Sequence, residues 1–118
     1  MFILYGISNC DTVKKAKKWL DAGQIDYRFH DFRKDGLTAQ DIERWVALIG
    51  TDKLINKRGT TWRQLSDAEK AKAESDPIEI LLQYPAIIKR PLLEGHSVCE
   101  VGFNENLYSD LINGDSHE

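Results

Sequence analysis

The chain has 118 residues, of which 42% are hydrophobic and 30% are charged, so it is long enough for one domain with a modest core and too short for a second full-sized domain. Its 16 lysines and arginines stand against 19 aspartates and glutamates, which gives a net charge of -3. This balance argues against nucleic acid or an anionic membrane as the main partner, because binding to phosphates needs a basic surface.

The first third of the chain predicts a βαβ unit. Residues 2–5 form a short apolar run typical of a buried strand, and residues 25–32 alternate loosely as a second strand. Residues 10–22 between them predict an amphipathic helix. Its apolar stripe consists of Val13, Ala16 and Leu20. A strand, a helix and a strand in this order favour two parallel strands.

The middle of the chain, residues 33–85, predicts helices and no strands. Thr38 and Asp41 form a capping-box pattern in front of a helix that Gly50 ends. Residues 51–61 look like a polar loop. Two further helices are predicted over residues 66–73 and 77–84. The side chains that we expect these helices to bury are Ile42, Trp45, Val46, Ile49, Ile78, Leu81 and Leu82.

The last third of the chain returns to strands. A β-hairpin is predicted from residues 86–93 and 98–101, with a turn at residues 94–96. Ile87 and Ile88 already suggest a strand at the start of the first segment. The tail from residue 104 predicts a final helix that frays from residue 114.

This order of elements, βαβ followed by a helical insertion and ββα, is that of the thioredoxin core. We therefore expect an α/β fold with a thioredoxin-like mixed four-stranded sheet and helices on both faces. Residues 1–118 would form a single domain, with a core of residues 1–32 and 86–118 and a helical insertion over residues 33–85.

Cys10 stands where a strand ends and a helix begins. Unpaired N–H groups and the positive end of the helix dipole stabilise an anion there, so this position favours the thiolate form. Lys14 and Lys15 follow one turn later and add positive charge. A small buried side chain at a helix start is the structural alternative. We favour a reactive thiol, because reactive cysteines occur at such junctions.

The chain lacks a Cys-x-x-Cys dithiol, since Val13 stands three residues after Cys10. A redox cycle must then be monothiol and be resolved by an outside thiol such as glutathione or by a distant cysteine. Cys99 lies on an apolar strand, and we interpret it as a core thiol rather than a resolving partner. Two cysteines, no leader pattern and no long apolar run predict a cytoplasmic protein without a membrane span.

Arg90 and Pro91 precede the predicted hairpin. An X-Pro bond at the start of a strand can be cis, which would hold the backbone of Lys89 and Arg90 beside the thiol for pairing with an extended substrate or glutathione. The Arg90 guanidinium is a candidate clamp for an oxyanion or a carboxylate, with a surface ion pair as its structural alternative.

Other candidate residues give weaker signals. A basic, aromatic stretch that could close over an anionic ligand, or simply be solvated, consists of Lys57, Arg58, Trp62 and Arg63. The histidines, which lack metal-ligand spacing and predict no metal site, are His30, His96 and His117. The tryptophans, which we expect to serve packing, are Trp19, Trp45 and Trp62.

Three separated motifs, YGISNCDTVKKA at residues 5–16, LINKRGTTW at residues 54–62 and IKRPL at residues 88–92, occur in one order along the chain. Together they resemble the ArsC/Spx family, and most closely its YffB branch. The resemblance covers nearly the whole chain. It implies a thioredoxin-like fold with a helical insertion, a nucleophilic cysteine at Cys10 and an Arg-Pro pair at positions 90 and 91.

The arsenate reductases of this family carry a histidine at the position of Gly6, a serine at the position of Val13 and three arginines around the oxyanion. The three arginine positions correspond here to Arg90, Asn56 and the neighbourhood of Gly102. Arg58, two residues from Asn56, is a candidate substitute. An arsenate dianion would therefore have fewer charge-assisted donors than in those reductases.

The resemblance to the YffB branch implies a glutathione-dependent thiol-disulfide oxidoreductase with no bound cofactor and with glutathione as co-substrate. The expected catalytic residues are Cys10 and Arg90, and the expected substrate- or glutathione-binding residues are Asn9, Arg58 and Pro91. Expected partners are glutathione, a protein disulfide or glutaredoxin. Two alternatives stay open: an arsenate reductase coupled to glutathione and glutaredoxin, and a non-catalytic Spx-like regulator that binds RNA polymerase.

Overall fold

A computed structural model describes residues 1–95 and 97–116, so His96 and His117 lie outside the described residues. The chain divides into two compact units. The first comprises Met1–Asp35 and Arg90–Glu118, and the second comprises Gly36–Lys89. Both boundaries fall a few residues later than those of the insertion expected over residues 33–85.

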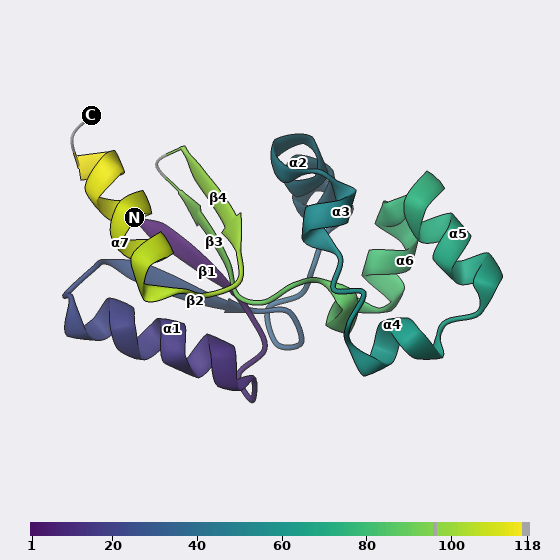
Figure 1. Cartoon of the computed structure of the whole chain (residues 1–118), viewed down its shortest axis with the longest axis horizontal. Helices are drawn as coiled ribbons and strands as arrows, with labels where there is room; N and C mark the ends of the chain where they lie inside the picture. Colours follow the sequence, from purple (N-terminus) through teal and green to yellow (C-terminus); the bar gives the residue numbers. More distant parts are fainter. Residues whose placement is uncertain (96, 117–118) are drawn as a thin grey trace. The chain divides into compact units, whose positions relative to one another are not determined.

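The first unit contains a mixed four-stranded sheet with the strand order β2-β1-β3-β4 (Figure 1). The strands are β1 (Phe2–Gly6), β2 (Tyr27–Asp31), β3 (Leu92–Gly95) and β4 (Val98–Val101). β1 is parallel to β2 and antiparallel to β3, and β3 is antiparallel to β4. The predicted fold class, the parallel pair and the hairpin are therefore confirmed.

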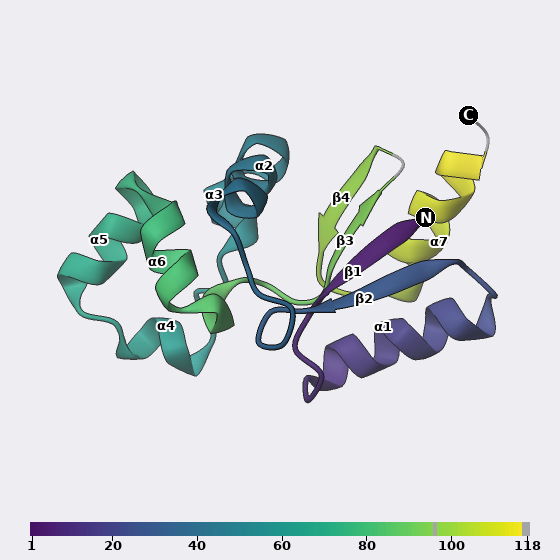
Figure 2. The same ribbon diagram turned by 180° about the vertical axis from the view of Figure 1, so that it is seen from behind.

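One end of this sheet collects three chain segments. The register pairs Gly6 with Asp31 and Tyr5 with Leu92, so β1 and β2 end where β3 begins. At the same end, the N–H of Gly102, just after β4, donates to the carbonyl of Pro91 at 2.9 Å. The loop after β1, the turn after β2 and the start of β3 therefore lie together, as the two opposite views show (Figures 1 and 2).

The helices α1 (Asp11–Ala22) and α7 (Glu105–Ser116) pack on one face of the sheet. The buried cluster on this face consists of Phe2, Leu4, Ala16, Leu20, Leu93 and Tyr108. The predicted stripe of α1 is confirmed, because Val13, Ala16 and Leu20 are all buried. Both helices of this unit share a face, whereas helices on both faces were expected. Residues 114–116, predicted to fray, continue α7.

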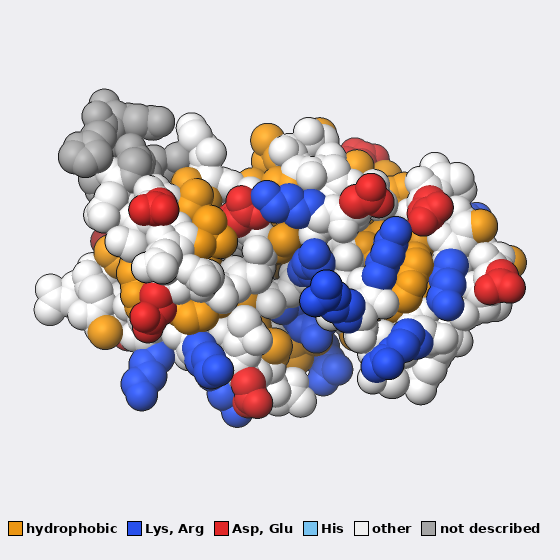
Figure 3. All heavy atoms as spheres, in the orientation of Figure 1, with side chains coloured by type: hydrophobic (Ala, Val, Ile, Leu, Met, Phe, Trp, Pro, Cys, Tyr) orange, Lys and Arg blue, Asp and Glu red, His pale blue; other side chains and the backbone are white. Residues whose placement is uncertain are grey.

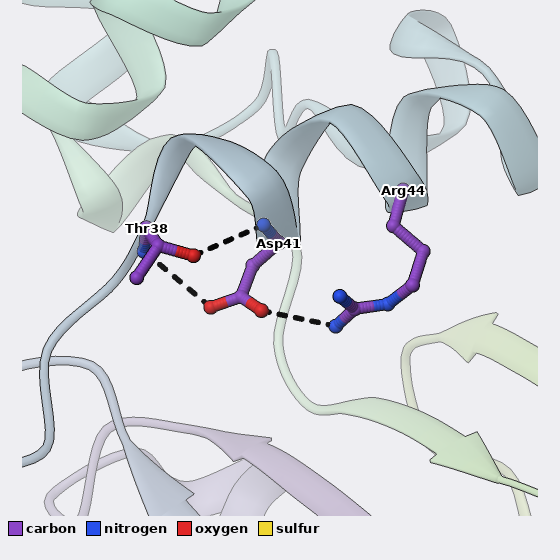
Figure 4. A network of polar contacts seen from close by, with 3 residues as sticks. All are labelled: Thr38, Asp41 and Arg44. Atoms are coloured by element: carbon purple, nitrogen blue, oxygen red, sulfur yellow. Dashed lines mark hydrogen bonds and ion pairs between the residues drawn. The ribbon is translucent and has the colours of Figure 1, made fainter.

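The second unit is helical, as predicted. Its elements are α2 (Ala39–Ile49), α3 (Thr51–Leu54), α4 (Thr60–Gln64), α5 (Asp67–Ser75), α6 (Pro77–Gln83) and the 3-10 helix η1 (Pro85–Ile87). The capping box of α2 is confirmed: the Asp41 N–H donates to Thr38 Oγ1 at 3.1 Å, and the Thr38 N–H donates to Asp41 Oδ2 at 3.4 Å. Arg44 then pairs with Asp41 Oδ1 at 3.1 Å (Figure 4).

The polar loop predicted over residues 51–61 is wrong. This stretch contains α3 and the first residues of α4. Its Leu54 and Ile55 side chains are buried in the second unit, so the segment packs as part of the core instead of forming a solvated loop. The strand predicted at Ile87 and Ile88 is also wrong. Ile87 ends η1, and Ile88 forms a single bridge with Ile55.

The burial predicted for α6 is partly wrong. Leu81 is buried as expected, but its companion is Ile80 rather than Ile78, and Leu82 is 39% exposed. The seven residues of α6 span only two turns. In so short an apolar segment, the sequence pattern does not define which face of the helix is buried, and packing against the neighbouring helices decides it.

The packing role predicted for the tryptophans is confirmed. Trp45 is fully buried and Trp62 nearly so, both in the second unit. Trp19 packs against the buried cluster of the first unit, with its ring edge-on to that of Tyr108.

Candidate active site

Cys10 is the N-cap residue of α1 and is half-buried. Its side chain makes no capping hydrogen bond, and its carbonyl accepts the first helical hydrogen bond, from the N–H of Lys14, at 3.0 Å. A helix leaves its first N–H groups without partners inside the helix, so those of Thr12 and Val13 are oriented toward the helix start. They can stabilise a negative charge formed on the Cys10 sulfur.

A buried carboxylate fixes the loop that carries Cys10. Asp31, at the end of β2, is only 4% exposed. Its Oδ2 accepts the N–H of Ser8 at 3.3 Å, and its Oδ1 accepts the N–H groups of Arg33 at 2.8 Å and Lys34 at 3.3 Å. One side chain therefore joins the Cys10 loop to the turn after β2. The sequence analysis treated Asp31 only as a strand residue and missed this role.

The charge of Asp31 follows from two opposed effects. Burial by itself raises the pKa of this carboxyl, but the hydrogen bonds from Arg33, Lys34 and Ser8 more than offset it and hold the pKa below its ordinary value of 3.8. Asp31 is therefore ionised at neutral pH, and each of its oxygens accepts backbone N–H groups in that state.

Gly6 and Val13, the two positions that depart from the arsenate reductase pattern, contact each other. A Cβ added to Gly6 would lie 2.7 Å from Cγ2 of Val13, which is fully buried. The two departures are thus physically linked, since the valine occupies the space that a side chain at position 6 would need.

Arg90 and Pro91 lie directly before β3, at the end of the sheet that also carries Cys10. The peptide bond between them is cis, the isomer considered in the sequence analysis. Arg90 is half-buried, with its Nε atom inside the protein, while Pro91 is buried. Asn9 is exposed in the loop before Cys10. The first unit therefore brings four of the five predicted site residues to one end of its sheet.

Arg58, the fifth predicted site residue, belongs to the second unit and is exposed. It lies in a turn shaped by Asn56, whose side-chain oxygen accepts the Arg58 N–H at 3.1 Å. In the neighbouring basic stretch, the Nζ of Lys57 lies 5.8 Å from the centre of the Trp62 ring and pairs with Glu74 at 3.4 Å. Over α4, α5 and α6, basic side chains flank hydrophobic surface (Figure 3).

Cys99 is half-buried on β4 rather than fully buried as expected, and the register places it far from Cys10. It pairs with Glu94, which in turn pairs with Ile3, whereas Cys10 follows the opposite end of β1. This separation is roughly 10 Å along the sheet and roughly 10 Å across it. A disulfide needs Cα atoms within about 7 Å, so the two thiols cannot join while the sheet is intact.

Two features are absent from residues 1–95 and 97–116. No three side chains among His, Cys, Asp and Glu come together in a way that could hold a metal ion. None of the helices in that part of the chain has the length and apolar character that crossing a membrane requires.

Comparison with known proteins gives close relatives along nearly the whole chain. The chain is 41% identical to an uncharacterized protein of Haemophilus influenzae over 92% of this chain and 96% of that protein. It is 29% identical to the global transcriptional regulator Spx 1 of Bacillus cereus over 90% of this chain and 82% of that protein.

Two solved structures share the fold. The structure of the YFFB protein matches with a TM-score of 0.85 and 42% identity, covering 92% of this chain and 96% of that one. An arsenate reductase related protein from Brucella melitensis matches with a TM-score of 0.75 and 38% identity, covering 94% and 93%. The model of the ArsC family matches residues 5–111. The chain therefore belongs to the ArsC family.

Proposed function

We propose that the protein is a glutathione-dependent thiol-disulfide oxidoreductase with Cys10 as its only nucleophile. The observation that carries the proposal is the position of Cys10 at the start of α1, beyond the reach of Cys99. A thiolate that forms there has backbone N–H donors beside it, and it must be regenerated by a thiol from outside the chain.

The reaction has two exchange steps. In the first, the Cys10 thiolate attacks one sulfur of a mixed disulfide with glutathione, forms a Cys10–glutathione disulfide and releases the other thiolate, which takes up a proton. In the second, the thiolate of another glutathione, or of glutaredoxin, attacks the glutathione sulfur and releases the Cys10 thiolate. Over both steps, the substrate sulfur leaves as a thiol, and the one incoming thiol ends in a disulfide with the glutathione of the original mixed disulfide, so one thiol is consumed and one is released.

Arg90 and Asn9 would hold the partner in these steps, and Pro91 would present backbone beside the thiol. Arg90 carries five donors in a planar fork that matches a carboxylate, and it lies at the end of the sheet where Cys10 lies. Arg58 stays a candidate for a second contact to the partner. Each role is a prediction about this chain's own residues.

The test is glutathione-dependent reduction of a small disulfide by the wild-type protein, by Cys10→Ser and by the matched control Cys99→Ser. We expect Cys10→Ser to lose at least a hundredfold in rate and Cys99→Ser to stay within twofold of the wild type, because only Cys10 would react. Full turnover by Cys10→Ser, or no turnover by the wild-type protein, would refute the proposal.

A regulator without catalysis is the second candidate, favoured by the similarity to proteins named global transcriptional regulator Spx. Val13 removes the Cys-x-x-Cys pair of an internal redox switch, so such a role would not need Cys10. Binding of purified bacterial RNA polymerase with equal affinity by the wild-type protein and Cys10→Ser would support this candidate. Arsenate reduction has less support, because Gly6 and Val13 stand at the positions of the histidine and the serine of the arsenate reductase pattern.

A further inference from the structure

We propose that Arg33 and Lys34 form a recognition site for the carboxylate groups of the disulfide that reacts at Cys10. The proposal rests on the function proposed for Cys10 and names its substrate class: a small disulfide that carries carboxylates close to its sulfur atoms, as glutathione does. Neither residue belongs to the three motifs that carry the family resemblance.

The structure ties these two residues to the Cys10 loop through Asp31. The backbone N–H groups of Arg33 and Lys34 bind one oxygen of this buried carboxylate, and the N–H of Ser8 binds the other. N–H groups that share one carboxylate lie within about 8 Å of each other. Ser8 stands two residues before Cys10, so the turn at residues 33–34 is held beside the loop that presents the thiol.

The turn is tied to the sheet on its other side as well. The N–H of Asp31 donates to Oδ2 of Asp35 at 2.9 Å, and the N–H of Phe32 donates to the carbonyl of Gly6 at 2.9 Å. These bonds fix both ends of a short turn whose two central side chains are exposed. The backbone is therefore held in place, while the two cationic side chains are accessible from solvent.

The charges near this end of the sheet are mostly positive. Within the part of the chain that the structure describes, Arg33 and Lys34 form no ion pair. Arg90, just before β3, and Lys14, in α1, add two cations. The acidic side chains on the same segments are Asp11, Asp31 and Asp35. Asp31 is buried, whereas Asp11 and Asp35 are exposed, so the four cations Arg33, Lys34, Arg90 and Lys14 stand against two exposed carboxylates, and the balance beside Cys10 is cationic.

A solvated surface turn is the structural alternative for Arg33 and Lys34. Such a turn needs no buried carboxylate that also binds the Cys10 loop. The shared Asp31 keeps the distance between the basic turn and the thiol fixed. Fixed distance is what recognition of a charge close to a reacting sulfur requires.

The first experiment compares alkylation of Cys10 by iodoacetate, which is anionic, with alkylation by iodoacetamide, which is neutral, in a Cys99→Ser background. The ratio of the two rates reports the local potential, because both reagents attack the same thiolate. We expect Arg33→Glu/Lys34→Glu to lower this ratio about sevenfold at 10 mM salt and about twofold at 0.15 M, for charges about 10 Å from the sulfur.

The matched control is Lys18→Glu/Arg28→Glu, which makes the same charge change on two exposed residues of the same unit. Lys18 lies about 12 Å along α1 from Cys10, and Arg28 lies about 10 Å along β2 from Asp31. At 10 mM salt, the proposal requires that the ratio fall at least twice as far in the Arg33/Lys34 variant as in this control. Any smaller difference between the two variants would overturn it.

The second experiment measures the reaction of the reduced protein with glutathione disulfide, which carries carboxylates, and with bis(2-hydroxyethyl) disulfide, which is uncharged. Arg33→Glu/Lys34→Glu should slow the first reaction about two- to sevenfold, depending on salt, and leave the second within twofold. Equal slowing of both would overturn the proposal. If the wild-type protein reacts with neither disulfide, the proposed function fails, and the alkylation ratio still decides the recognition site.

Discussion

Gly6→Ala should destabilise the protein, because the added Cβ would lie 2.7 Å from Cγ2 of Val13. Nonbonded carbon atoms prefer about 3.5–4.0 Å. Val13 is fully buried and β-branched, and a β-branched side chain in a helix has one strongly preferred rotamer, so it cannot turn aside without strain. Such overpacking costs about 1–3 kcal/mol, of which about 0.5–1 kcal/mol is recovered because glycine is unfavourable within a strand.

The net loss in the free energy of unfolding should therefore be about 0.5–2 kcal/mol. Val13→Ala alone should cost about 2 kcal/mol, from the lost burial of two methyl groups and the space they leave. It also removes Cγ2, the atom that the new Cβ would overlap. In the Val13→Ala background, Gly6→Ala should therefore be neutral or stabilising by up to about 1 kcal/mol, which gives a coupling energy of about 1–3 kcal/mol, the cost of the overpacking alone.

Urea unfolding of the four proteins, followed by tryptophan fluorescence, measures this coupling. Gly23→Ala is the matched control, because its added Cβ would meet its nearest atom at 3.5 Å, an ordinary contact. The packing argument would be refuted if Gly6→Ala cost the same, within about 0.5 kcal/mol, with valine and with alanine at position 13.

Two further substitutions test buried polar groups. Tyr108 has a buried hydroxyl with no hydrogen-bond partner among the described residues, and burial raises the pKa of this group. Tyr108→Phe should therefore raise the free energy of unfolding by about 1 kcal/mol in urea unfolding, and a loss of stability would contradict the assignment. Asp31→Asn should cost about 2 kcal/mol at pH 7. Folding lowers the pKa of Asp31 below 3.8, so the folded protein binds a proton at this carboxyl less tightly than the unfolded chain does. The contribution of ionised Asp31 to the free energy of unfolding is therefore fully present well above pH 3.8 and is lost as the pH falls below that value. If Asp31→Asn lowered the free energy of unfolding equally at pH 7 and at about pH 3, the stabilising role of the ionised carboxylate would be ruled out.

Elements with strong local signals could be predicted from the sequence. The stripe of α1 and the capping box of α2 depend on residues three and four apart, so the signal and the structure it predicts lie within one turn of helix. The region of residues 51–61 could not be predicted in this way. Its structure depends on the burial of Leu54 and Ile55 and on the pairing of Ile55 with Ile88, which is distant in the sequence.

The candidate site likewise contains one feature that neighbouring residues predict and one that depends on residues distant in the sequence. The position of Cys10 at a helix start follows from adjacent residues, and the structure places it there. The role of Asp31 could not be predicted, because it depends on the register that pairs Gly6 with Asp31 and so brings Ser8 within reach of the carboxylate. The available signal was a carboxylate at the end of a strand that also contains Tyr27, Phe29 and His30.

The pairing of β1 with β3 has a consequence for the rate of folding. Tyr5 and Leu92 are neighbours in the sheet but lie roughly 90 positions apart in the chain, so their contact closes a long loop. Residues 36–89 within that loop form the compact second unit. If this unit folds first, roughly 35 flexible residues are left to close, which lowers the entropic cost by about 0.8 kcal/mol. Substitutions that unfold Trp45 and its neighbours should therefore slow the formation of the central strand pair as well.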